Sequence, residues 1–276
     1  MKILKKEILN SNSGINITRL EIASSEIAKK VLPGQFVVLM TEEKGERIPL
    51  TVVNSDSIKG IITLIFQEAG LTTKLLGKLN PGDSLYALTG PLGHATEIKK
   101  YGKVILVGGG VGIAEIYPVA RALKKAGNHV TTVLGARTKE LLILEKELTD
   151  ASSEVMVATD DGSYGKKGFT TDIVNELLSK GKYDLVYAVG PIPMMRRVSA
   201  VTKNFNVKTI VSLNALMVDA TGMCGGCRVN VAGKIKFSCV DGPEFDAALV
   251  DWDTLDKRNK VYIGQEKHIC SLYKLS

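Results

Sequence analysis

Aromatic residues are scarce in this chain, and no basic block stands out. Of its 276 residues, 5% are aromatic, and 36 lysines and arginines against 29 aspartates and glutamates give a net charge of +7. The basic residues are scattered in short pairs such as Lys99-Lys100 and Lys166-Lys167. Nucleic-acid binding surfaces gather basic residues together, often with aromatic residues among them. The sequence therefore argues against a nucleic-acid partner.

Long hydrophobic runs are missing as well. Residues 1–7 contain no apolar core of a signal peptide. The most apolar window, residues 104–120, carries four glycines, a glutamate and a proline. It falls short of the roughly 20 apolar residues that a membrane helix needs. We therefore expect a cytoplasmic protein with no membrane partner.

The first part of the chain has the pattern of an all-β domain. The length fits about two domains. Up to residue 98, short β-like runs are separated by turn signals such as Pro81-Gly82-Asp83, with no long helix between them. This pattern predicts an antiparallel barrel or sandwich. The expected strands are residues 15–22, 35–40, 46–53, 61–67 and 84–88.

From residue 99 the pattern changes to alternating strands and helices, which predicts a parallel sheet flanked by helices. The expected strands are residues 103–107, 129–134, 154–159 and 184–189, and the expected helices are residues 113–126, 139–148 and 171–179. A small region around the cysteines follows. The sequence thus predicts a mixed β and α/β fold with three domains, residues 1–98, 99–212 and 213–276.

A glycine-rich loop, Gly108 to Gly112, joins the first strand of the α/β part to its first helix. Free backbone N–H groups and the helix dipole at such a loop suit a phosphate group. The frame is not G-x-G-x-x-G, and the second strand ends in Gly135-Ala136-Arg137 without the acid of the usual ribose-binding fingerprint. A plain tight turn is the alternative reading.

Two more loops, residues 159–165 and 190–195, follow later strands of the same predicted sheet. Ligands of open α/β sheets bind at the carboxyl ends of the strands. The three loops together therefore predict one crevice for a dinucleotide.

The cysteine cluster is the strongest motif. Asp219, Cys224, Cys227 and Cys239 have the spacing D-x4-C-x2-C-x11-C, which matches the C-x4-C-x2-C of plant-type [2Fe–2S] sites with aspartate in the first position. Crowded cysteines in a reducing compartment indicate a metal or cluster before disulfides. The alternative is a structural zinc site with Cys270 as the fourth ligand. Otherwise Cys270 is a free thiol.

Taken together, these motifs resemble the ferredoxin–NADP+ reductase superfamily over nearly the whole chain, and within it the iron–sulfur flavoproteins. Three further segments carry the resemblance: Arg47-Ile48-Pro49-Leu50-Thr51, residues 66–73, and Gly90-Pro91-Leu92-Gly93. Many relatives have cysteine before the Gly190-Pro191 motif, where this chain has Val189. The resemblance implies that the chain binds FAD, NAD(H) and a [2Fe–2S] cluster.

The resemblance also implies which residues bind the cofactors, and no side chain is expected to act as a general acid or base. For FAD they are Arg47, Pro49, Leu50, Thr51, Phe66, Gln67, Glu68, Gly70, Thr72 and Thr73. For NAD(H) they are Gly109, Gly110, Val111, Gly112, Ala136, Arg137, Asp160, Asp161, Gly162, Gly190, Pro191 and Met194. Taken alone, Arg47 fits a surface side chain equally well, and Thr72 and Thr73 fit a helix cap.

Aspartate in the first ligand position is similar to the small subunits of the electron-bifurcating NADH-dependent reduced ferredoxin:NADP+ oxidoreductase family. That resemblance implies an oxidoreductase subunit in a heterodimer, whose larger subunit holds FAD and [4Fe–4S] clusters and handles ferredoxin and NADP(H). The alternative is the electron-transfer subunit of an NAD-dependent dihydroorotate dehydrogenase, a family with cysteine at all four positions. Because Arg137 suits a 2′-phosphate, the choice of NAD over NADP rests on the family.

Overall fold

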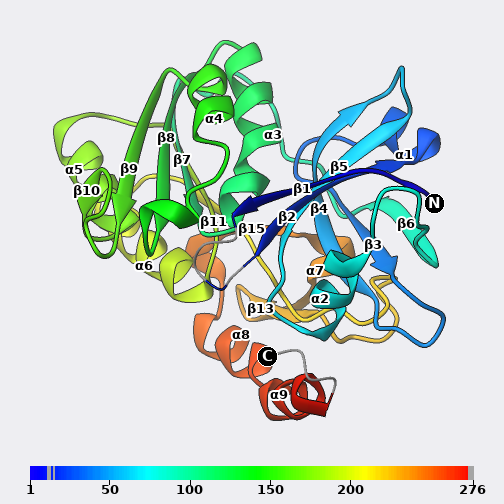
Figure 1. Cartoon of the computed structure of the whole chain (residues 1–276). Helices are drawn as coiled ribbons and strands as arrows, with labels where there is room; N and C mark the ends of the chain where they lie inside the picture. The colour runs from blue at the N-terminus through cyan, green and yellow to red at the C-terminus, as the bar shows by residue number, and fades with distance from the viewer. Residues whose placement is uncertain (11–13, 15, 273–276) are drawn as a thin grey trace. The chain divides into compact units, whose positions relative to one another are not determined.

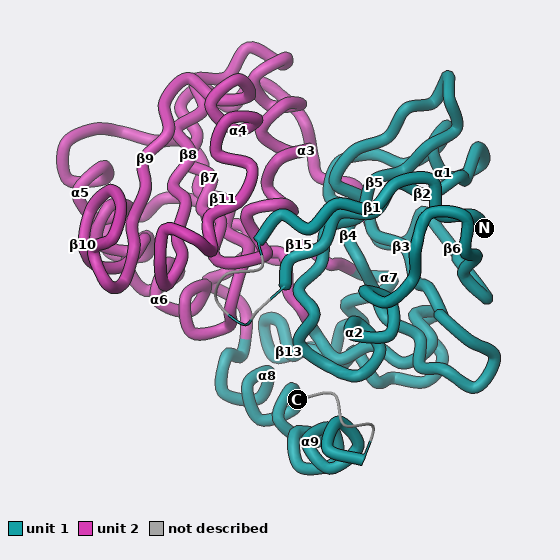
Figure 2. Tube along the Cα trace, in the orientation of Figure 1, with its two compact units in different colours: residues 1–93, 215–241, 251–276 teal, residues 94–214, 242–250 magenta. Residues whose placement is uncertain are grey.

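The structure, a computed structural model, describes residues 1–10, 14 and 16–272. The chain divides into two compact units (Figure 2). Unit 1 comprises residues 1–93, 215–241 and 251–276, and unit 2 comprises residues 94–214 and 242–250. The cysteine-rich segment is thus grouped with the N-terminal part of the chain, while residues 242–250 return to the α/β part. The predicted domain boundaries at residues 98 and 212 stay a prediction.

Unit 1 is built on a six-stranded antiparallel sheet in the order β1-β2-β5-β4-β3-β6 (Figure 1). An isolated bridge between Lys2 and Ser84 joins the start of β1 to the segment that leads into β6, which closes the sheet into a barrel. The predicted antiparallel barrel is confirmed; the predicted strand at 15–22 begins at a residue outside the described ones. The strands are β1 (Ile3–Asn10), β2 (Ile17–Ala23), β3 (Phe36–Met40), β4 (Ile48–Asp56), β5 (Ile61–Gln67) and β6 (Ala87–Leu92).

The barrel interior is filled by alternate residues of its strands. On β2, Leu20 and Ile22 are fully buried, and on β5 Ile62, Leu64 and Phe66 are 2% exposed or less. Alternation with a period of two places these side chains on one face, and each buried side chain stabilises the fold by about 1.5–3 kcal/mol. The short helices α1 (Ser25–Lys30) and α2 (Leu71–Lys78) accompany the barrel.

The cysteine-rich part of unit 1 contains a hairpin of β13 (Arg228–Val231) and β14 (Lys234–Phe237). Its two loop residues, Ala232 and Gly233, have φ values of 53° and 74°. Two successive positive φ values match the twist that two-residue hairpin loops need. Three helices, none of them predicted, follow the hairpin: α7 (Ser238–Asp241), α8 (Trp252–Asn259) and α9 (Ile263–Leu272).

Unit 2 has a seven-stranded sheet in the order β10-β9-β8-β7-β11-β12-β15. All neighbouring strands are parallel except β12 and β15, which are antiparallel. The predicted parallel sheet is confirmed, and β15 is an addition that the sequence did not predict. The strands are β7 (Lys103–Gly109), β8 (His129–Ala136), β9 (Glu154–Thr159), β10 (Lys166–Lys167), β11 (Leu185–Val189), β12 (Thr209–Ser212) and β15 (Glu244–Asp246).

The helices of unit 2 confirm two of the three expected ones, residues 113–126 and 171–179, and add one at residues 192–204 that the sequence did not predict. They are α3 (Gly112–Lys125), α4 (Glu145–Ala151), α5 (Thr170–Lys180) and α6 (Ile192–Asn204), with short 3₁₀ turns at Lys139–Leu141 and Ala247–Leu249. The predicted helix at 139–148 is wrong as a single element. The chain breaks at Leu144, whose φ is 56°, and Leu141 and Leu144 are both buried within this irregular stretch.

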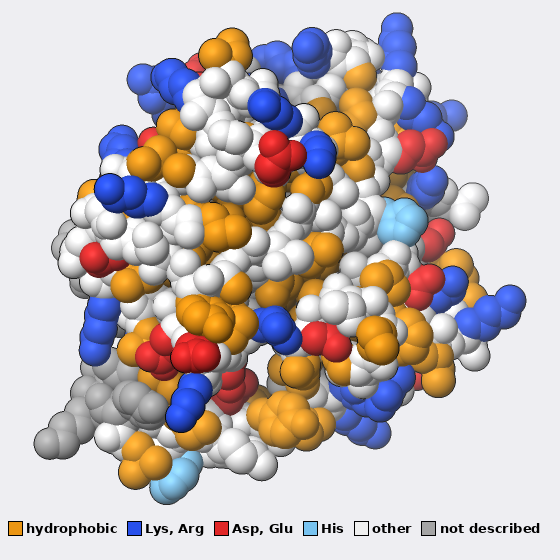
Figure 3. Space-filling view, turned by 90° about the vertical axis from the view of Figure 1, so that its right-hand side faces the viewer, with side chains coloured by type: hydrophobic (Ala, Val, Ile, Leu, Met, Phe, Trp, Pro, Cys, Tyr) orange, Lys and Arg blue, Asp and Glu red, His pale blue; other side chains and the backbone are white. Residues whose placement is uncertain are grey.

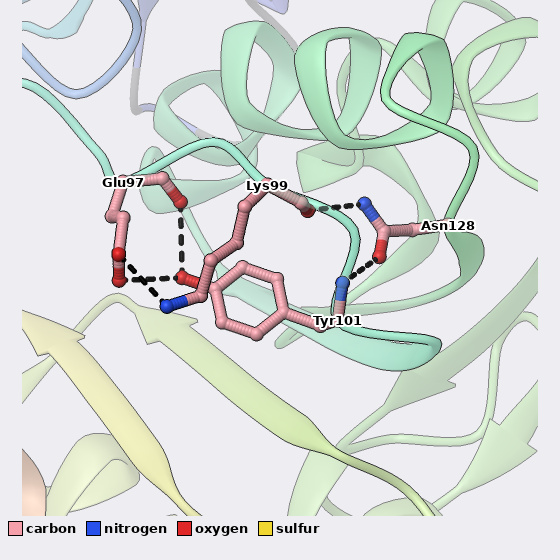
Figure 4. Close-up of polar contacts among 4 residues, drawn as sticks. All are labelled: Glu97, Lys99, Tyr101 and Asn128. Carbon is pink, nitrogen blue, oxygen red and sulfur yellow. Dashed lines mark hydrogen bonds and ion pairs between the residues drawn. The ribbon is translucent and has the colours of Figure 1, made fainter.

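The segment that leads into β7 is attached to the rest of unit 2 by Asn128, which is 5% exposed (Figure 4). Asn128 Oδ1 accepts hydrogen bonds from the N–H groups of Tyr101 and Gly102, at 2.6 and 3.0 Å. Asn128 Nδ2 donates to the carbonyls of Lys99 and Leu123, at 2.8 and 2.9 Å. All the hydrogen-bonding capacity of this side chain is therefore used to fix the segment.

The face drawn in Figure 3 shows lysine and arginine side chains scattered among acidic and apolar ones. This distribution agrees with the scattered basic pairs in the sequence. Within the described part of the chain, no helix has the length and apolar character of a membrane span.

Candidate functional site

The glycine loop between β7 and α3 approaches the loop after β11 so closely that side chains do not fit. A Cβ atom at Gly109 would lie 2.4 Å from Met194 Sδ, and one at Gly112 would lie 2.5 Å from the Val189 carbonyl oxygen. Gly110 has a φ of 57° and borders open space, with no atom within 4 Å of the position of a Cβ. The loop therefore places the half-buried residues Gly110 and Val111 at the beginning of a 14-residue helix, where a phosphate group suits the helix N-terminus.

The loops after β8 and β9 are bonded to each other. The N–H of Asp160 donates to Ala136 O at 3.2 Å, and the N–H of Asp161 donates to Arg137 O at 3.3 Å. The hydroxyl and backbone N–H of Ser163 both donate to the Asp161 carboxylate, at 2.7 and 2.9 Å. These bonds hold the pKa of Asp161 below its ordinary value of 3.8. Asp161, whose lowered pKa favours the ionised carboxylate, is thus bonded through its backbone N–H to Arg137.

The structure brings the predicted nicotinamide-nucleotide residues together within unit 2. They follow β7, β8, β9 and β11, which are consecutive neighbours in the sheet. Gly190, at the end of β11, is close to the glycine loop, because a Cβ there would lie 3.1 Å from Gly109 O. One carboxyl edge of one sheet therefore carries all of these residues, as expected for a dinucleotide site.

In unit 1, the residues predicted to bind FAD belong to β4, the end of β5 and α2. Arg47 is exposed and directly precedes β4. The Thr72 hydroxyl donates to Glu46 Oε2 at 3.1 Å, so the segment before β4 and the first turn of α2 lie together. Thr73 Oγ1 accepts from the Gly70 N–H at 3.0 Å, and a Cβ at Gly70 would meet no atom within 4 Å. A basic side chain near an open helix N-terminus fits the pyrophosphate of FAD.

Pro49, Leu50 and Thr51 lie on β4, where they pair with Val38, Val37 and Phe36 of β3. All three are half-buried, as is Gln67 at the end of β5.

Two other predicted FAD residues have side chains that the barrel itself uses. Phe66 is 2% exposed and belongs to the barrel core. Glu68 accepts hydrogen bonds from the Thr18 hydroxyl at 2.6 Å and from Asn16 Nδ2 at 3.2 Å. The Phe66 side chain is therefore occupied in the core, and the Glu68 carboxylate is bonded to the neighbouring strand segment.

The four predicted cluster ligands form two pairs in unit 1. Cys227 and Cys239 are each 2% exposed, and their Sγ atoms lie 3.1 Å apart. The Thr221 N–H, at 3.0 Å, and the Cys224 thiol both donate to Asp219, which holds the pKa of Asp219 below its ordinary 3.8. Arg47 acts on the pKa of Asp219 in the same direction. The positive charge of Arg47, a predicted FAD-binding residue, therefore lowers the pKa of Asp219, a predicted cluster ligand.

The backbone around these ligands is a glycine-rich loop with an N–H group directed at a ligand sulfur. Gly222 and Gly225 have φ values of 84° and 66°, and the N–H of Gly226 donates to Cys224 Sγ at 3.3 Å. Burial, followed by the neighbouring Cys227 thiol, raises the pKa of Cys239 to about 12. Binding of a cluster must therefore displace the proton of this thiol.

A [2Fe–2S] cluster takes two ligands on each of two irons, and the two pairs supply four. Among the residues that the structure describes, no three His, Cys, Asp or Glu side chains are gathered closely enough to hold a single metal ion. The paired donors fit a two-iron group. Cys270, the fourth ligand of the zinc alternative, lies on α9.

Sequence reasoning missed two contributors to these sites. Glu46, which bonds Thr72, directly precedes Arg47 and could have been noticed from that position. Arg258 of α8 donates through Nη2 to the carbonyl oxygen of Gly226 in the ligand loop, at 3.0 Å. No local pattern signals this contact, because the residues are 32 positions apart.

A barrel with an open helix N-terminus, a dinucleotide-binding sheet and a cysteine-rich loop define a flavin-dependent oxidoreductase with an iron–sulfur site. Comparison with known families agrees with that class. Residues 214–251 match the family described as the iron-sulfur cluster binding domain of dihydroorotate dehydrogenase B. Residues 106–200 match the oxidoreductase NAD-binding domain.

Whole-chain comparisons extend this result. The chain is 51% identical to a dihydroorotate dehydrogenase B electron transfer subunit homolog of Thermotoga maritima, over 89% of this chain and 87% of that protein. It is 43% identical to a protein of Clostridium beijerinckii described only by its position near adh, over 96% and 90% of the two chains. A solved structure of the electron-bifurcating NADH-dependent reduced ferredoxin-NADP oxidoreductase contains a chain with 46% identity and a TM-score of 0.94, covering 100% of this chain and 98% of that one.

The chain belongs to the family of dihydroorotate dehydrogenase B electron transfer subunits and their homologues. The predicted membership of the ferredoxin–NADP+ reductase superfamily is confirmed. The predicted oxidoreductase class and electron-transfer role are confirmed, as is the cofactor set of FAD, a [2Fe–2S] cluster and NAD(H). The assignment of individual residues to these cofactors stays a prediction.

Proposed function

We propose that this chain is the small subunit of an electron-bifurcating NADH-dependent reduced ferredoxin:NADP+ oxidoreductase. The observation that carries the proposal is the similarity, over the full length of this chain, to a chain of the solved oxidoreductase of that name. Asp219 in the first ligand position supports the same choice, because the dihydroorotate dehydrogenase family resembled by the sequence has cysteine there. In this proposal the chain exchanges electrons with NAD(H) and delivers them to a larger partner.

The proposed NAD(H) site lies at the carboxyl edge of the unit 2 sheet. The backbone of Gly109, Gly110, Val111 and Gly112 receives the pyrophosphate at the start of α3, where the helix dipole favours negative charge. Ala136 and Arg137 after β8, and Asp160, Asp161 and Gly162 after β9, surround the adenosine ribose. Gly190, Pro191 and Met194 after β11 position the nicotinamide end. In this assignment the protein binds and orients, and no side chain transfers a proton.

The proposed FAD site is on the barrel of unit 1. Arg47 pairs with the pyrophosphate, which suits the planar fork of its guanidinium. The N–H groups of Thr72 and Thr73 at the start of α2 bind the same group, and Gly70 leaves open space for it. Pro49, Leu50 and Thr51 on β4 border the ring system. Phe66, Gln67 and Glu68 contribute backbone groups.

The proposed cluster ligands are Asp219 and Cys224 on one iron and Cys227 and Cys239 on the other. This assignment follows the two pairs that the side chains form. Bound in these sites, FAD and the [2Fe–2S] cluster supply the exchange between two-electron hydride chemistry and single-electron transfer. The contribution of the chain is to hold the groups and to set the charge around them.

The proposed partner is a larger flavoprotein subunit with FAD and [4Fe–4S] clusters, which handles ferredoxin and NADP(H). Relatives whose names call them electron transfer subunits, such as the Thermotoga maritima homolog and a 35% identical protein of Geobacillus, support a heteromeric assembly. We place the complex in the cytoplasm, because three cysteines assigned to iron need a compartment that keeps thiols reduced. We also propose that the chain has three functional segments: residues 1–98 bind FAD, residues 99–212 bind NAD(H), and residues 213–276 bind the cluster.

The test is an anaerobic assay of the chain purified together with its partner subunit. We expect NADP+ to be reduced only when NADH and reduced ferredoxin are both present, because bifurcating chemistry couples the two donors. Omission of either donor should abolish the reaction. NADP+ reduction by NADH alone would overturn the proposal.

The second candidate is the electron-transfer subunit of an NAD-dependent dihydroorotate dehydrogenase. The names of the relatives at 35–36% identity favour it, and so does the description of the matched iron–sulfur domain. The same preparation distinguishes the two. Reduction of NAD+ by dihydroorotate, without any response to ferredoxin, would support the second candidate.

A further inference from the structure

Helix α8 is bonded to the cysteine-rich segment at three points. Asn259 Oδ1 accepts from the Leu216 N–H at 3.2 Å, just before the ligands. Arg258 Nη2 donates to Gly226 O at 3.0 Å, between two ligands. The N–H of Asp251, the N-cap of α8, donates to Asn230 O of the hairpin at 2.9 Å. The helix itself lies outside residues 214–251, which match the iron–sulfur domain.

The contact of Arg258 differs from the other two because it carries a charge. Arg258 is half-buried, and its Nε atom is buried without a hydrogen-bond partner. A guanidinium in a protein keeps its proton. A permanent positive charge is therefore held against the loop that contains Cys224 and Cys227. Lys257, the preceding residue on the same helix, is exposed.

The carbonyl that Arg258 binds also sets the direction of the neighbouring N–H group. In a trans peptide the C=O and the next N–H point in opposite directions. With Gly226 O bonded to Arg258, the N–H of Cys227 points away from Arg258. The N–H of Gly226 itself donates to Cys224 Sγ at 3.3 Å. Arg258 therefore restrains the peptide between Gly226 and Cys227, and its charge polarises that peptide.

We infer that Arg258 is a positioning residue for the cluster and that it raises the cluster's reduction potential. Reduction adds one negative charge to the cluster. A fixed positive charge and oriented N–H groups stabilise that charge, and such outer contacts are known levers on iron–sulfur potentials. The inference rests on the proposed cluster ligands, since Arg258 acts through the loop that carries two of them.

The test is a redox titration of the anaerobically purified complex, following the cluster by visible circular dichroism and electron paramagnetic resonance. At the midpoint potential of the wild type, Arg258→Gln should lower the ratio of reduced to oxidised cluster by about three- to tenfold. A tenfold change corresponds to about 59 mV for one electron. Arg258→Lys, which keeps the charge, should recover at least half of the shift. Lys257→Gln removes one charge from the exposed side of α8 and should leave the ratio within about twofold.

An Arg258→Gln cluster that titrates like the wild type would overturn the inference, and so would a shift of equal size in Lys257→Gln. If Arg258→Gln is purified without iron, it has no cluster to titrate, and the inference is then tested by the iron content and potential of Arg258→Lys. Full iron content and a potential near that of the wild type would support the charge effect, whereas a strongly shifted potential would refute it. Iron and sulfide analysis of the wild type tests the ligand set separately, because a wild-type chain without iron would refute the ligands before Arg258 is considered.

Discussion

The Tyr187 hydroxyl donates a hydrogen bond of 2.7 Å to Glu244 Oε1, and the Thr96 hydroxyl donates to the same oxygen at 2.5 Å. Glu244 lies on β15, the strand that follows the last proposed ligand, Cys239, and joins the unit 2 sheet. Burial raises the pKa of Glu244 above its ordinary 4.5, although the two hydroxyl donors act in the opposite direction. A three-residue strand is therefore held in place by a carboxyl group whose protonation is linked to folding.

This linkage predicts how Glu244→Gln changes the dependence of stability on pH. Because the pKa is higher in the folded state, the folded state binds more protons than the unfolded state in the window between the two pKa values. The contribution of Glu244 is fully present below about pH 4.5 and is lost as the pH rises through the raised value. Glutamine does not titrate. The stability of Glu244→Gln relative to the wild type should therefore increase with pH, by at most about 1.4 kcal/mol per pH unit.

Urea unfolding between pH 5 and pH 7.5 checks this expectation. The exposed Glu42→Gln variant serves as the control and should run parallel to the wild type. A stability difference between Glu244→Gln and the wild type that stays constant with pH would contradict the prediction.

Asn128→Ala should destabilise the protein by about 2–4 kcal/mol. The substitution removes the side-chain hydrogen bonds to four backbone groups, those of Lys99 and Tyr101 (Figure 4) and those of Gly102 and Leu123, of which the Leu123 carbonyl keeps the backbone N–H of residue 128 as a partner. A buried polar group that loses its partner costs about 1–3 kcal/mol. Exposed Asn175→Ala on α5 is the control, with an expected change within about 0.5 kcal/mol. If the two variants unfold at the same midpoint, water replaces the hydrogen bonds of the Asn128 side chain without loss of stability, which would contradict the prediction.

The core of unit 2 was predictable because its strands are continuous apolar runs that end in glycine or polar residues. The predicted strand at 154–159 coincides with β9, and the predicted run 103–107 lies within β7. The predicted helix 139–148 failed because Leu141, Leu142, Leu144 and Leu148 imitate a helical stripe. In the structure, Leu144 adopts a left-handed conformation that divides the stretch.

The candidate sites were predictable from the sequence only where their residues form a motif with local spacing. The motif from Asp219 to Cys239 is local and gave all four proposed ligands, which the structure arranges in pairs. The return of Glu244 to the unit 2 sheet and the contact of Arg258 with Gly226 are long-range pairings. A strand of three residues has no periodicity to detect, and a single arginine on a polar helix does not differ from its neighbours.

Loss of a buried ligand should remove the cluster. Cys239→Ala leaves Cys227 without its neighbour 3.1 Å away, and we expect the iron content to fall at least about tenfold, since even changes in outer contacts weaken metal binding by that amount. Cys270→Ala, at the thiol on α9, should keep its iron and its visible spectrum. Metal analysis and visible absorption measure both. Iron loss in Cys270→Ala with retention in Cys239→Ala would reverse the assignment.

Asp219→Cys should keep the cluster but change its reduction potential and its electron paramagnetic resonance spectrum. A thiolate is a softer ligand than a carboxylate and shares more charge with iron. Asp219→Ala supplies no donor and should lose iron. If Asp219→Cys leaves both the potential and the spectrum unchanged, the Asp219 carboxylate is not an iron ligand.

Asp161→Asn should weaken the preference for NADH over NADPH. Hydrogen bonds from Ser163 lower the pKa of the Asp161 carboxyl group, and the Asp161 N–H is bonded to Arg137 O. The negative charge of Asp161 repels a 2′-phosphate. Removing that charge should lower the ratio of flavin reduction rates with NADH and NADPH by about three- to tenfold, equivalent to roughly 1 kcal/mol. Arg137→Ala should change the ratio in the opposite direction, because the guanidinium attracts the phosphate.

Stopped-flow reduction under anaerobic conditions measures both variants, with Glu154→Gln at the opposite end of β9 as the control. Equal ratios in Asp161→Asn and the wild type would exclude Asp161 from nucleotide choice, and a wild-type preference for NADPH would refute the NAD(H) assignment itself.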